Sequence, residues 1–387
     1  MNAISDTPVP GFVYDPSTPE FQEQLWDVYR TMRDQHPLYH DPERGIYALS
    51  RFSDVLRAVH DHETFSSVVE EAQSLLPQMI YMDPPRHTAL RALVSRAFTP
   101  KRVAEVEPLT RKTAQELVED IAARGGCELQ HEYAAVVPSV VIARMIGVTD
   151  EHVDSFRTWT ESFLEIKGSE DFADAAANIY GLFAQLLDER RHQPRDDMMT
   201  ALIDAEVDGE KLTDEELLGF CLLLILAGND TTSSLIGNGT VLLARHPDQR
   251  ELLVREPGLW RNAVEEMNRI ESPTQVLPRT TTRDVEFHGR TIPAGSRVML
   301  IWGAANHDER EFPTPQRFDV TRPISHHLAF GHGVHYCLGA NLARLEACVA
   351  FEEWHARFPE YELTGEPTRI TSIWARAFSR VPIALRH

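Results

Sequence analysis

Apolar positions recur every three to four residues through most of the chain between residues 20 and 260. This is the period of a helix that buries one face. The pattern predicts helices over Phe21–Gln35, Ser53–His60, Ala89–Phe98, Val103–Ala123, Glu151–Glu165 and Asn178–Arg191. Only a short strand, over Gly45–Leu49, is predicted before the middle of the chain.

The clearest helix begins at Thr213. The run Thr213-Asp214-Glu215-Glu216 is a capping box, in which the hydroxyl and the third following carboxylate satisfy free N–H groups reciprocally. No proline follows until Pro247, so the helix has room for about 33 residues, or ~50 Å. It is apolar nearly all round over Leu217–Ala227, which predicts a path through the centre of the molecule.

After Pro273 the period shortens to two. Strands are predicted over Arg279–Thr282, Val285–His288 and Ser296–Ile301, separated by His-Gly and Pro-Ala-Gly turns. The fold class is therefore mainly α with a smaller β portion. No flexible linker, low-complexity run or repeat divides the chain. We therefore expect a single domain over residues 1–387, with an irregular segment over about residues 1–18.

Charge and composition exclude several partners. The formal net charge of −21 argues against nucleic acid and anionic membranes. The first fourteen residues contain no apolar run, and Leu217–Ala227 is far shorter than the ~20 residues that span a bilayer. Four scattered cysteines without a CxxC pair argue against a disulfide framework or a zinc site. These features predict a cytoplasmic protein in a reducing compartment, with no membrane attachment.

One glycine-rich loop near the C-terminus, Phe330 to Gly339, contains a single cysteine, Cys337. The glycines permit close approach to a flat ligand, and an apolar-periodic helix follows directly. The free N–H groups of that helix favour thiolate over thiol at Cys337, and a thiolate in such a loop suits an axial bond to haem iron. The alternative is a buried structural cysteine beside a turn.

The loop matches Phe-x-x-Gly-x-His-x-Cys-x-Gly at every fixed position and resembles the haem-binding signature of the cytochrome P450 superfamily. Further motifs in the same order extend this resemblance over roughly residues 20 to 387. It implies the cytochrome P450 fold with a long central helix over haem b, and Cys337 as the metal ligand. Phe330, His335 and Gly339 are implied to contact the cofactor.

The central helix contains a second motif, Ala227-Gly228-Asn229-Asp230-Thr231-Thr232. A carboxylate and a glycine are costly inside an apolar helix, which indicates function. A solvated kink with a threonine bonded to its own turn remains the alternative. The motif resembles the family's oxygen-activation motif. By that resemblance Gly228 leaves room for dioxygen, Thr231 positions it and Asp230 connects it to a proton source.

The resemblance also implies how the haem carboxylates and the surrounding fold are held. His87, Arg91, Arg279 and His335 match the positions that hold the two propionates. Glu266 and Arg269, in a Glu-x-x-Arg pair, are expected to form a buried structural network with Arg317.

The family's pattern places several mostly apolar segments beside the substrate. The residues expected there are Leu75, Leu76, Met79, Leu224, Ala227, Val276, Ile373 and Trp374. Each of these side chains is equally compatible with a core position. Their character predicts a hydrophobic small-molecule substrate, such as a terpenoid, steroid, fatty acyl or polyketide-like compound.

The chain contains no flavin or nicotinamide fingerprint. Electrons are therefore expected from a separate ferredoxin or flavodoxin with its reductase. Arg91, Arg96, Lys101 and Arg102 form a basic cluster suited to docking such a partner. The protein is otherwise expected to be a monomer.

Four functional classes follow from these features. The leading one is a monooxygenase that activates O₂ and hydroxylates or otherwise oxidises its substrate. The second is a peroxide-driven or redox-neutral haem-thiolate enzyme, against which the intact Asp230-Thr231 pair argues. The third is a haem-dependent sensor or carrier without turnover. The last is a helical binding protein without haem, in which Cys337 is merely buried.

Overall fold

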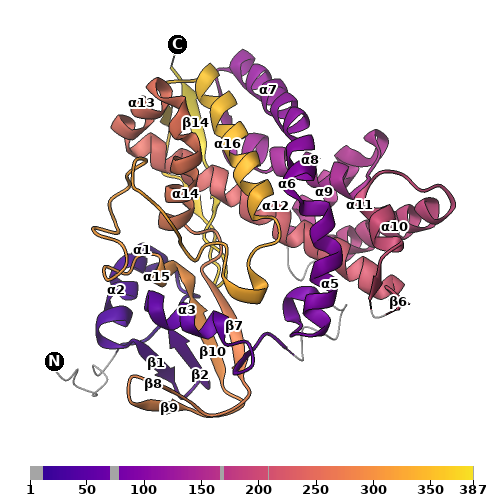
Figure 1. Ribbon diagram of the computed structural model, residues 1–387. Helices are drawn as coiled ribbons and strands as arrows, with labels where there is room; N and C mark the ends of the chain where they lie inside the picture. The colour runs from indigo at the N-terminus through magenta and orange to yellow at the C-terminus, as the bar shows by residue number, and fades with distance from the viewer. Residues whose placement is uncertain (1–11, 70–77, 166–169, 208, 387) are drawn as a thin grey trace. The chain divides into compact units, whose positions relative to one another are not determined.

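The computed structural model describes residues 12–69, 78–165, 170–207 and 209–386. The chain divides into two compact units. Unit 1 consists of residues 1–69, 262–337 and 369–377, and unit 2 of residues 70–261, 338–368 and 378–387. Figure 1 follows the chain through its helices and strands, and the two units are described separately.

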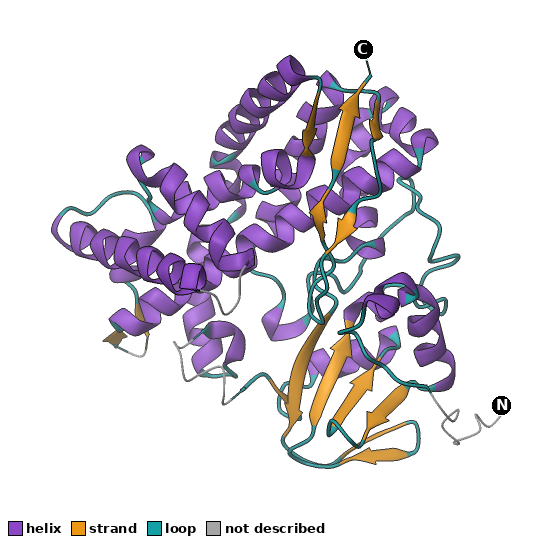
Figure 2. Ribbon diagram, turned by 180° about the vertical axis from the view of Figure 1, so that it is seen from behind, coloured by secondary structure: helices purple, strands orange, loops and turns teal. Residues whose placement is uncertain are grey.

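Unit 1 is built on a five-stranded sheet in the order β1-β2-β10-β7-β3, seen from behind in Figure 2. Strands β2 and β10 are parallel and the other neighbours are antiparallel. The strands are β1 (Leu38–Asp41), β2 (Ile46–Leu49), β3 (Phe65–Ser66), β7 (Val276–Thr281) and β10 (Arg297–Ile301), with a separate hairpin of β8 (Val285–Phe287) and β9 (Arg290–Ile292).

The helices of unit 1 are short. They are α1 (Pro19–Glu23), α2 (Leu25–Gln35), α3 (Phe52–His60), α15 (Trp302–Ala305) and the 3₁₀ turn η5 (Gly333–His335). Two apolar clusters pack these elements: Val55, Phe65 and Leu300 are buried in one, and Tyr29, Met32 and Ile301 in the other.

Unit 2 is mainly helical. Its α-helices are α5 (Arg86–Val94), α6 (Pro100–Glu105), α7 (Glu107–Arg124), α8 (Val136–Ile146), α9 (Asp150–Glu165), α10 (Glu170–His192), α11 (Met198–Ile203), α12 (Asp214–Arg245), α13 (Pro247–Arg255) and α16 (Ala340–Arg357). Helix α14 (Trp260–Ile270) begins in unit 2 and ends in unit 1. Shorter turns are η1 (Met79–Tyr81), η2 (Ser95–Phe98), η3 (Gln130–Ala134, a π-helix) and η4 (Pro257–Leu259).

The strands of unit 2 form small sheets. One is β11-β14-β4, from β11 (Tyr361–Leu363), β14 (Pro382–Leu385) and β4 (Gly126–Glu128). Strands β5 (Glu206–Val207) and β6 (Glu210–Lys211) form a hairpin. Strand β12 (Thr368–Arg369), which begins in unit 2 and ends in unit 1, pairs with β13 (Phe378–Arg380).

The predicted central helix is confirmed as α12, with 32 residues and both hydrogen bonds of the capping box at Thr213 and Glu216. It is the one helix in the described part of the chain that is long and apolar enough to span a bilayer, and 67% of its most apolar window is buried inside the protein. Such burial is typical of a core helix in a globular protein.

Sequence periodicity misplaced some boundaries. The segment predicted over residues 103–123 is two helices, α6 and α7, because Pro108 occupies the first turn of a new helix after Val106. Residues 89–98 change from α-helix to 3₁₀ at Ser95. Helix α10 begins at Glu170, before the predicted Asn178. Helix α8 was missed because it is apolar on nearly every face and therefore has no period.

Candidate active site

The cysteine loop in unit 1 is closed by its own backbone. The Cys337 N–H donates to the Phe330 carbonyl over 2.8 Å, and Tyr336 N–H donates to the Gly333 carbonyl over 3.1 Å. Phe330 is buried, whereas Cys337 is half-buried. The loop therefore holds the thiol at a fixed point that remains accessible within this unit.

Two glycines are required for this conformation. Gly331 and Gly333 have φ angles of +65° and +66°, in the left-handed region that glycine favours. A Cβ at Gly333 would lie 2.5 Å from the carbonyl oxygen of Val59 in α3, and one at Gly331 would lie 3.4 Å from the Trp302 ring. The first contact is with backbone and cannot be relieved by a rotamer change. Gly333 thus allows the loop to pack directly on α3.

Unit 1 also contains two of the four predicted propionate-binding residues. Arg279 is 7% exposed on β7, and its Nη1 donates to the Pro278 carbonyl over 2.8 Å. His335 is half-buried in η5, two residues before Cys337. A soft sulfur ligand and cationic donors are the chemistry that a haem with two carboxylates needs, so the donor set fits that group.

Helix α12 in unit 2 contains the predicted oxygen-activation motif. Most of its residues are buried, but Leu223 and Thr231 are only partly buried and Ala227 is exposed. Positions spaced by four residues lie on one face of a helix, so these three form a stripe, which we call the open face of α12. An open face in the middle of a core helix is unusual, and it lies at the predicted motif.

Hydroxyl groups bond back to the helix around this face. Thr231 Oγ1 donates to the Ala227 carbonyl over 2.7 Å, and Ser233 and Ser234 donate to the Asp230 carbonyl over 2.9 and 2.6 Å. The alternative expected from sequence, a threonine bonded to its own turn, is therefore present. It does not exclude function, because the Thr231 oxygen can still accept a hydrogen bond while its proton is donated.

Helix packing alone explains why a glycine occupies position 228. A Cβ at this position would lie 2.7 Å from Cδ1 of Ile142, which belongs to α8. The glycine therefore allows α12 to approach α8 closely. Room for dioxygen remains a separate expectation for this residue.

The other predicted cofactor contacts in unit 2 lie on α5 and before α16. His87 is 1% exposed and Arg91 is half-buried, and their spacing of four residues places them on one face of α5. Gly339 is the N-cap of α16, and a Cβ there would have no heavy atom within 4 Å in the described part of the chain. Packing within the chain therefore gives no reason for a glycine at that position.

The structural network differs from the prediction in one member. Glu266 and Arg269 are fully buried, and the Arg269 Nε lies 2.7 Å from the Glu266 carboxylate. The predicted third member, Arg317, is instead exposed and lies 3.7 Å from Asp319. Arg322 takes its place, with Nε 3.0 Å from Glu266.

The reason lies in the local path of the chain. Phe318 and Val320 are buried while Arg317 points outward. Arg322 reaches inward five residues later, where it also donates to the carbonyls of Pro313, Thr314 and Arg317.

The predicted substrate contacts have mixed outcomes. Leu75 and Leu76 lie outside the described residues. Met79 and Leu224 are buried in the core of unit 2, and Val276, fully buried in unit 1, cannot line an open cavity. Core packing, the alternative expected from sequence, thus accounts for these three. Ala227 is exposed, and Ile373 and Trp374 are half-buried.

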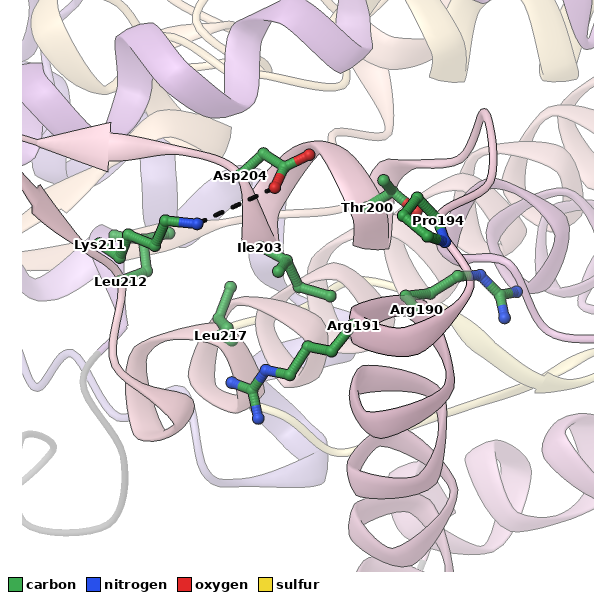
Figure 3. A pocket seen from close by; sticks show the side chains of 9 residues that line it. All are labelled: Arg190, Arg191, Pro194, Thr200, Ile203, Asp204, Lys211, Leu212 and Leu217. Carbon is green, nitrogen blue, oxygen red and sulfur yellow. Dashed lines mark ion pairs between the residues drawn. The ribbon is translucent and has the colours of Figure 1, made fainter.

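A cavity of about 350 Å³ in unit 2 contains none of the predicted site residues. Figure 3 shows its walls, where the Arg190 guanidinium points away from Ile203 and Lys211 points toward Asp204. Each of its cations already has an acidic partner: Arg190 with Asp197, Arg191 with Asp214 and Lys211 with Asp204. The cavity is therefore no candidate for the reaction site.

Sequence reasoning missed one buried acid, Glu346 in α16. It is 1% exposed, and burial raises the pKa of its carboxyl group well above the usual value. The available signal was a glutamate on the apolar face of the helix that follows Cys337.

Comparison with known proteins agrees with this geometry. The cytochrome P450 family model matches residues 142–257 and 258–359. Cytochrome P450 130 of Mycobacterium tuberculosis is 40% identical over 90% of this chain and 91% of its own length. Vitamin D(3) 25-hydroxylase of Pseudonocardia autotrophica is 38% identical over 94% of each chain.

Solved structures give the same result. The crystal structure of CYP109E1 from Bacillus megaterium in complex with testosterone has a TM-score of 0.88 and 31% identity, covering 94% of this chain and 99% of that one. The chain belongs to the cytochrome P450 family, as a monooxygenase that uses haem b with a cysteine thiolate ligand and electrons from a separate redox partner to oxidise a hydrophobic small molecule.

Proposed function

We propose that this monooxygenase oxidises an apolar substrate of steroid-like size at the open face of α12. The observation that carries the proposal is the exposure of Ala227, with Leu223 and Thr231 on the same face, in a helix that is mostly buried. An alanine presents little bulk and no polar group, so a rigid apolar ring system fits beside it. Two relatives support this class by their names, one a vitamin D(3) hydroxylase and one crystallised with testosterone.

The residue roles proposed for cofactor binding follow the family's motif position by position. Cys337 ligates the iron, and Phe330 and Gly339 contact the macrocycle. Arg279 and His335 in unit 1, and His87 and Arg91 in unit 2, donate to the propionates. In this proposal the whole chain is a single catalytic domain. The burial of Arg279 and His87 supports it, because buried cationic and imidazole groups are placed where anionic partners offset their desolvation.

Haem supplies dioxygen binding and oxygen-transfer chemistry when it is bound, and a thiolate ligand promotes O–O cleavage. The chain supplies the protons that this chemistry consumes. Thr231 Oγ1, held by its bond to the Ala227 carbonyl, accepts and positions a proton donor at the open face. Asp230, the preceding residue, exchanges protons with solvent and resupplies the donor that Thr231 positions.

The proposed electron donor is a small acidic ferredoxin, and the protein is proposed to work as a soluble cytoplasmic monomer. Arg96 and Lys101 are exposed and supply positive charge on an acidic molecule. Arg102 contributes less, because it already pairs with Asp196 at 2.6 Å and with Glu105 at 3.3 Å. Reduction by a plant-type ferredoxin should slow as ionic strength rises, and a rate independent of salt would exclude this docking mode.

The substrate class is tested by the spin-state change of the haem on titration with testosterone, vitamin D₃ and palmitate. The steroid and the secosteroid should shift the spectrum at lower concentration than the fatty acid. Ala227→Leu should raise the dissociation constant for testosterone at least tenfold. Ala201→Leu, an exposed alanine on α11, serves as the matched control. A response to palmitate alone would reject the proposed class.

A further inference from the structure

Helices α12 and α16 of unit 2 share a buried polar contact that the proposed function does not use. The Thr232 hydroxyl donates to the carboxyl group of Glu346. Thr232 is 2% exposed and Glu346 is 1% exposed, so the contact is closed to solvent. Thr232 directly follows the proposed proton-transfer residues Asp230 and Thr231.

Two buried oxygens, one on each of these helices, lack a donor. Oε1 of Glu346 and Oδ1 of Asn229 are both buried without a hydrogen-bond partner in the described part of the chain. Asn229 lies three residues before Thr232, and therefore on the same face of α12. Two acceptor oxygens cannot satisfy each other unless one of them carries a proton. A proton on Glu346 turns one of these acceptors into a donor.

The charged groups on the neighbouring elements do not offset an ionised Glu346. Helix α7 contributes Arg111, which pairs with Glu107, Glu352 and Glu353, and Glu119, which pairs with Arg357. Arg102 on α6 pairs with Glu105 and Asp196, and Arg144 on α8 is exposed. On α12 the nearest ionisable group in sequence is Asp230, itself an acid. Burial, opposed only by the Thr232 hydrogen bond, raises the pKa of Glu346.

We infer that Glu346 is a neutral acid that fixes the rotation of α12 through Thr232 and Asn229 and thereby aims Asp230 and Thr231. It is a positioning residue, since it acts through α12. In this arrangement Glu346 holds its proton throughout turnover and delivers none. The inference rests on the proposed roles of Asp230 and Thr231.

The protonation state is tested without turnover. Infrared spectra of the haem-loaded wild-type protein at pH 7.5 should show the C=O stretch of a protonated carboxyl group. That band should be absent from Glu346→Gln and present in Glu352→Gln, which changes a half-exposed glutamate of the same helix. Wild-type protein without the band would overturn the inference.

Unfolding provides a second readout. A carboxyl group whose folded pKa is raised binds a proton that the unfolded chain releases above its ordinary pKa. As pH rises from 5.5, the unfolding constant of wild type should therefore increase relative to Glu346→Gln, tenfold for each pH unit until Glu346 ionises. A ratio that stays constant between pH 5.5 and 8 would contradict a neutral Glu346.

Positioning is tested by the share of NADPH electrons released as hydrogen peroxide, with testosterone as the probe and spinach ferredoxin as the donor. Glu346→Leu should raise peroxide release severalfold, and Glu346→Gln, whose amide can both accept from Thr232 and donate to Asn229, should restore most of the coupling. Thr232→Val, an isosteric change, covers the case in which Glu346→Leu fails to fold, and it should also raise release.

Equal uncoupling in the Gln and Leu variants would show that the carboxyl proton is delivered during turnover, and would overturn the positioning role. Unchanged coupling in both Glu346→Leu and Thr232→Val would also overturn the positioning role. If Thr231→Ala leaves coupling unchanged, the proposed function of the Asp230-Thr231 pair fails instead, while the infrared and unfolding results still decide the state of Glu346.

Discussion

Thr231 combines a hydrogen bond within its own helix with a proposed role in the chemistry. Its hydroxyl proton is committed to the Ala227 carbonyl, while the side chain lies on the open face of α12. A hydroxyl that was needed only for the helix would be equally well placed on a buried face. The exposure of Thr231 is what supports its proposed role in proton delivery.

Replacing Thr231 separates these roles. Thr231→Ala should leave haem content and NADPH consumption nearly unchanged but divert most electrons to hydrogen peroxide, because the proton donor is no longer positioned. Thr231→Ser keeps the hydroxyl and should retain most of the coupling. Product and peroxide formed per NADPH, measured together, check this. Full coupling in the alanine variant would remove Thr231 from the mechanism.

The Glu266 network gives a prediction that distinguishes two arginines. Arg322→Ala removes a cation from a fully buried carboxylate and should lower the free energy of unfolding by about 3 kcal/mol. It should also lower haem content. Arg317→Ala, at an exposed position, should change stability by less than ~0.5 kcal/mol.

Urea unfolding of the two arginine variants, with haem quantified by absorbance, is the required measurement. The reverse order of effects would restore Arg317 as the third member of the network.

At the scale of elements, the sequence predicted whether a segment is a helix or a strand better than it predicted where that segment begins and ends. The capping box and the long apolar run specified α12 without ambiguity, because each is a local signal. Its open face could not be predicted, since exposure of Ala227 depends on what packs against α12. Val276 is an apolar residue in a strand, and its burial also depends on what packs against it. The sequence therefore could not assign it to the core or to the substrate pocket.

The packing of α12 on α8 can be tested with a double-mutant cycle. Gly228→Ala gains ~1 kcal/mol of helix propensity but forces a methyl group against Cδ1 of Ile142, at a cost of ~1–3 kcal/mol. Ile142→Val removes that atom. Gly228→Ala should therefore be neutral or destabilising alone and stabilising in the Ile142→Val background.

Denaturant unfolding of the four proteins in this cycle gives the coupling between the two positions. Independent effects would show that the glycine at position 228 does not depend on contact with Ile142.

For the whole molecule, buried histidines couple folding to pH. Burial lowers the pKa of His307 in unit 1 and of His355 in unit 2 to about 3. The His355 ring bonds to the Phe351 carbonyl at 2.8 Å and lies 3.3 Å from the Tyr361 hydroxyl. Both rings are therefore neutral in the folded protein at neutral pH.

Acid should destabilise the fold through these rings. Below pH 6.5 these histidines bind protons in the unfolded chain but not in the folded protein. The free energy of unfolding therefore falls as pH falls. Between pH 7.5 and 5.5 wild type should lose about 1.4 kcal/mol relative to His355→Gln. Thermal unfolding at several pH values measures this difference. His192→Gln, an exposed histidine, is the control, and parallel profiles for His355→Gln and wild type would refute the effect.

The sequence predicted the motifs of the candidate site more completely than the side-chain contacts that support them. The cysteine loop and the Asp230-Thr231 motif are contiguous in sequence, so a short pattern specifies them. Arg322 and Glu346 act through partners far along the chain, at Glu266 and Thr232. Such pairs carry no local signal, and choosing Arg322 over Arg317 requires the path of the backbone.

The exposure of Ala227 also bears on how such an enzyme changes over evolutionary time. Most substitutions in a core helix are removed by selection because they disturb folding. Ala227 is exposed, so a larger side chain there meets fewer neighbours than one at a buried position of α12, and in its proposed role it alters what the enzyme accepts. Lineages can therefore exchange one substrate for another at this position while the rest of α12 stays under constraint.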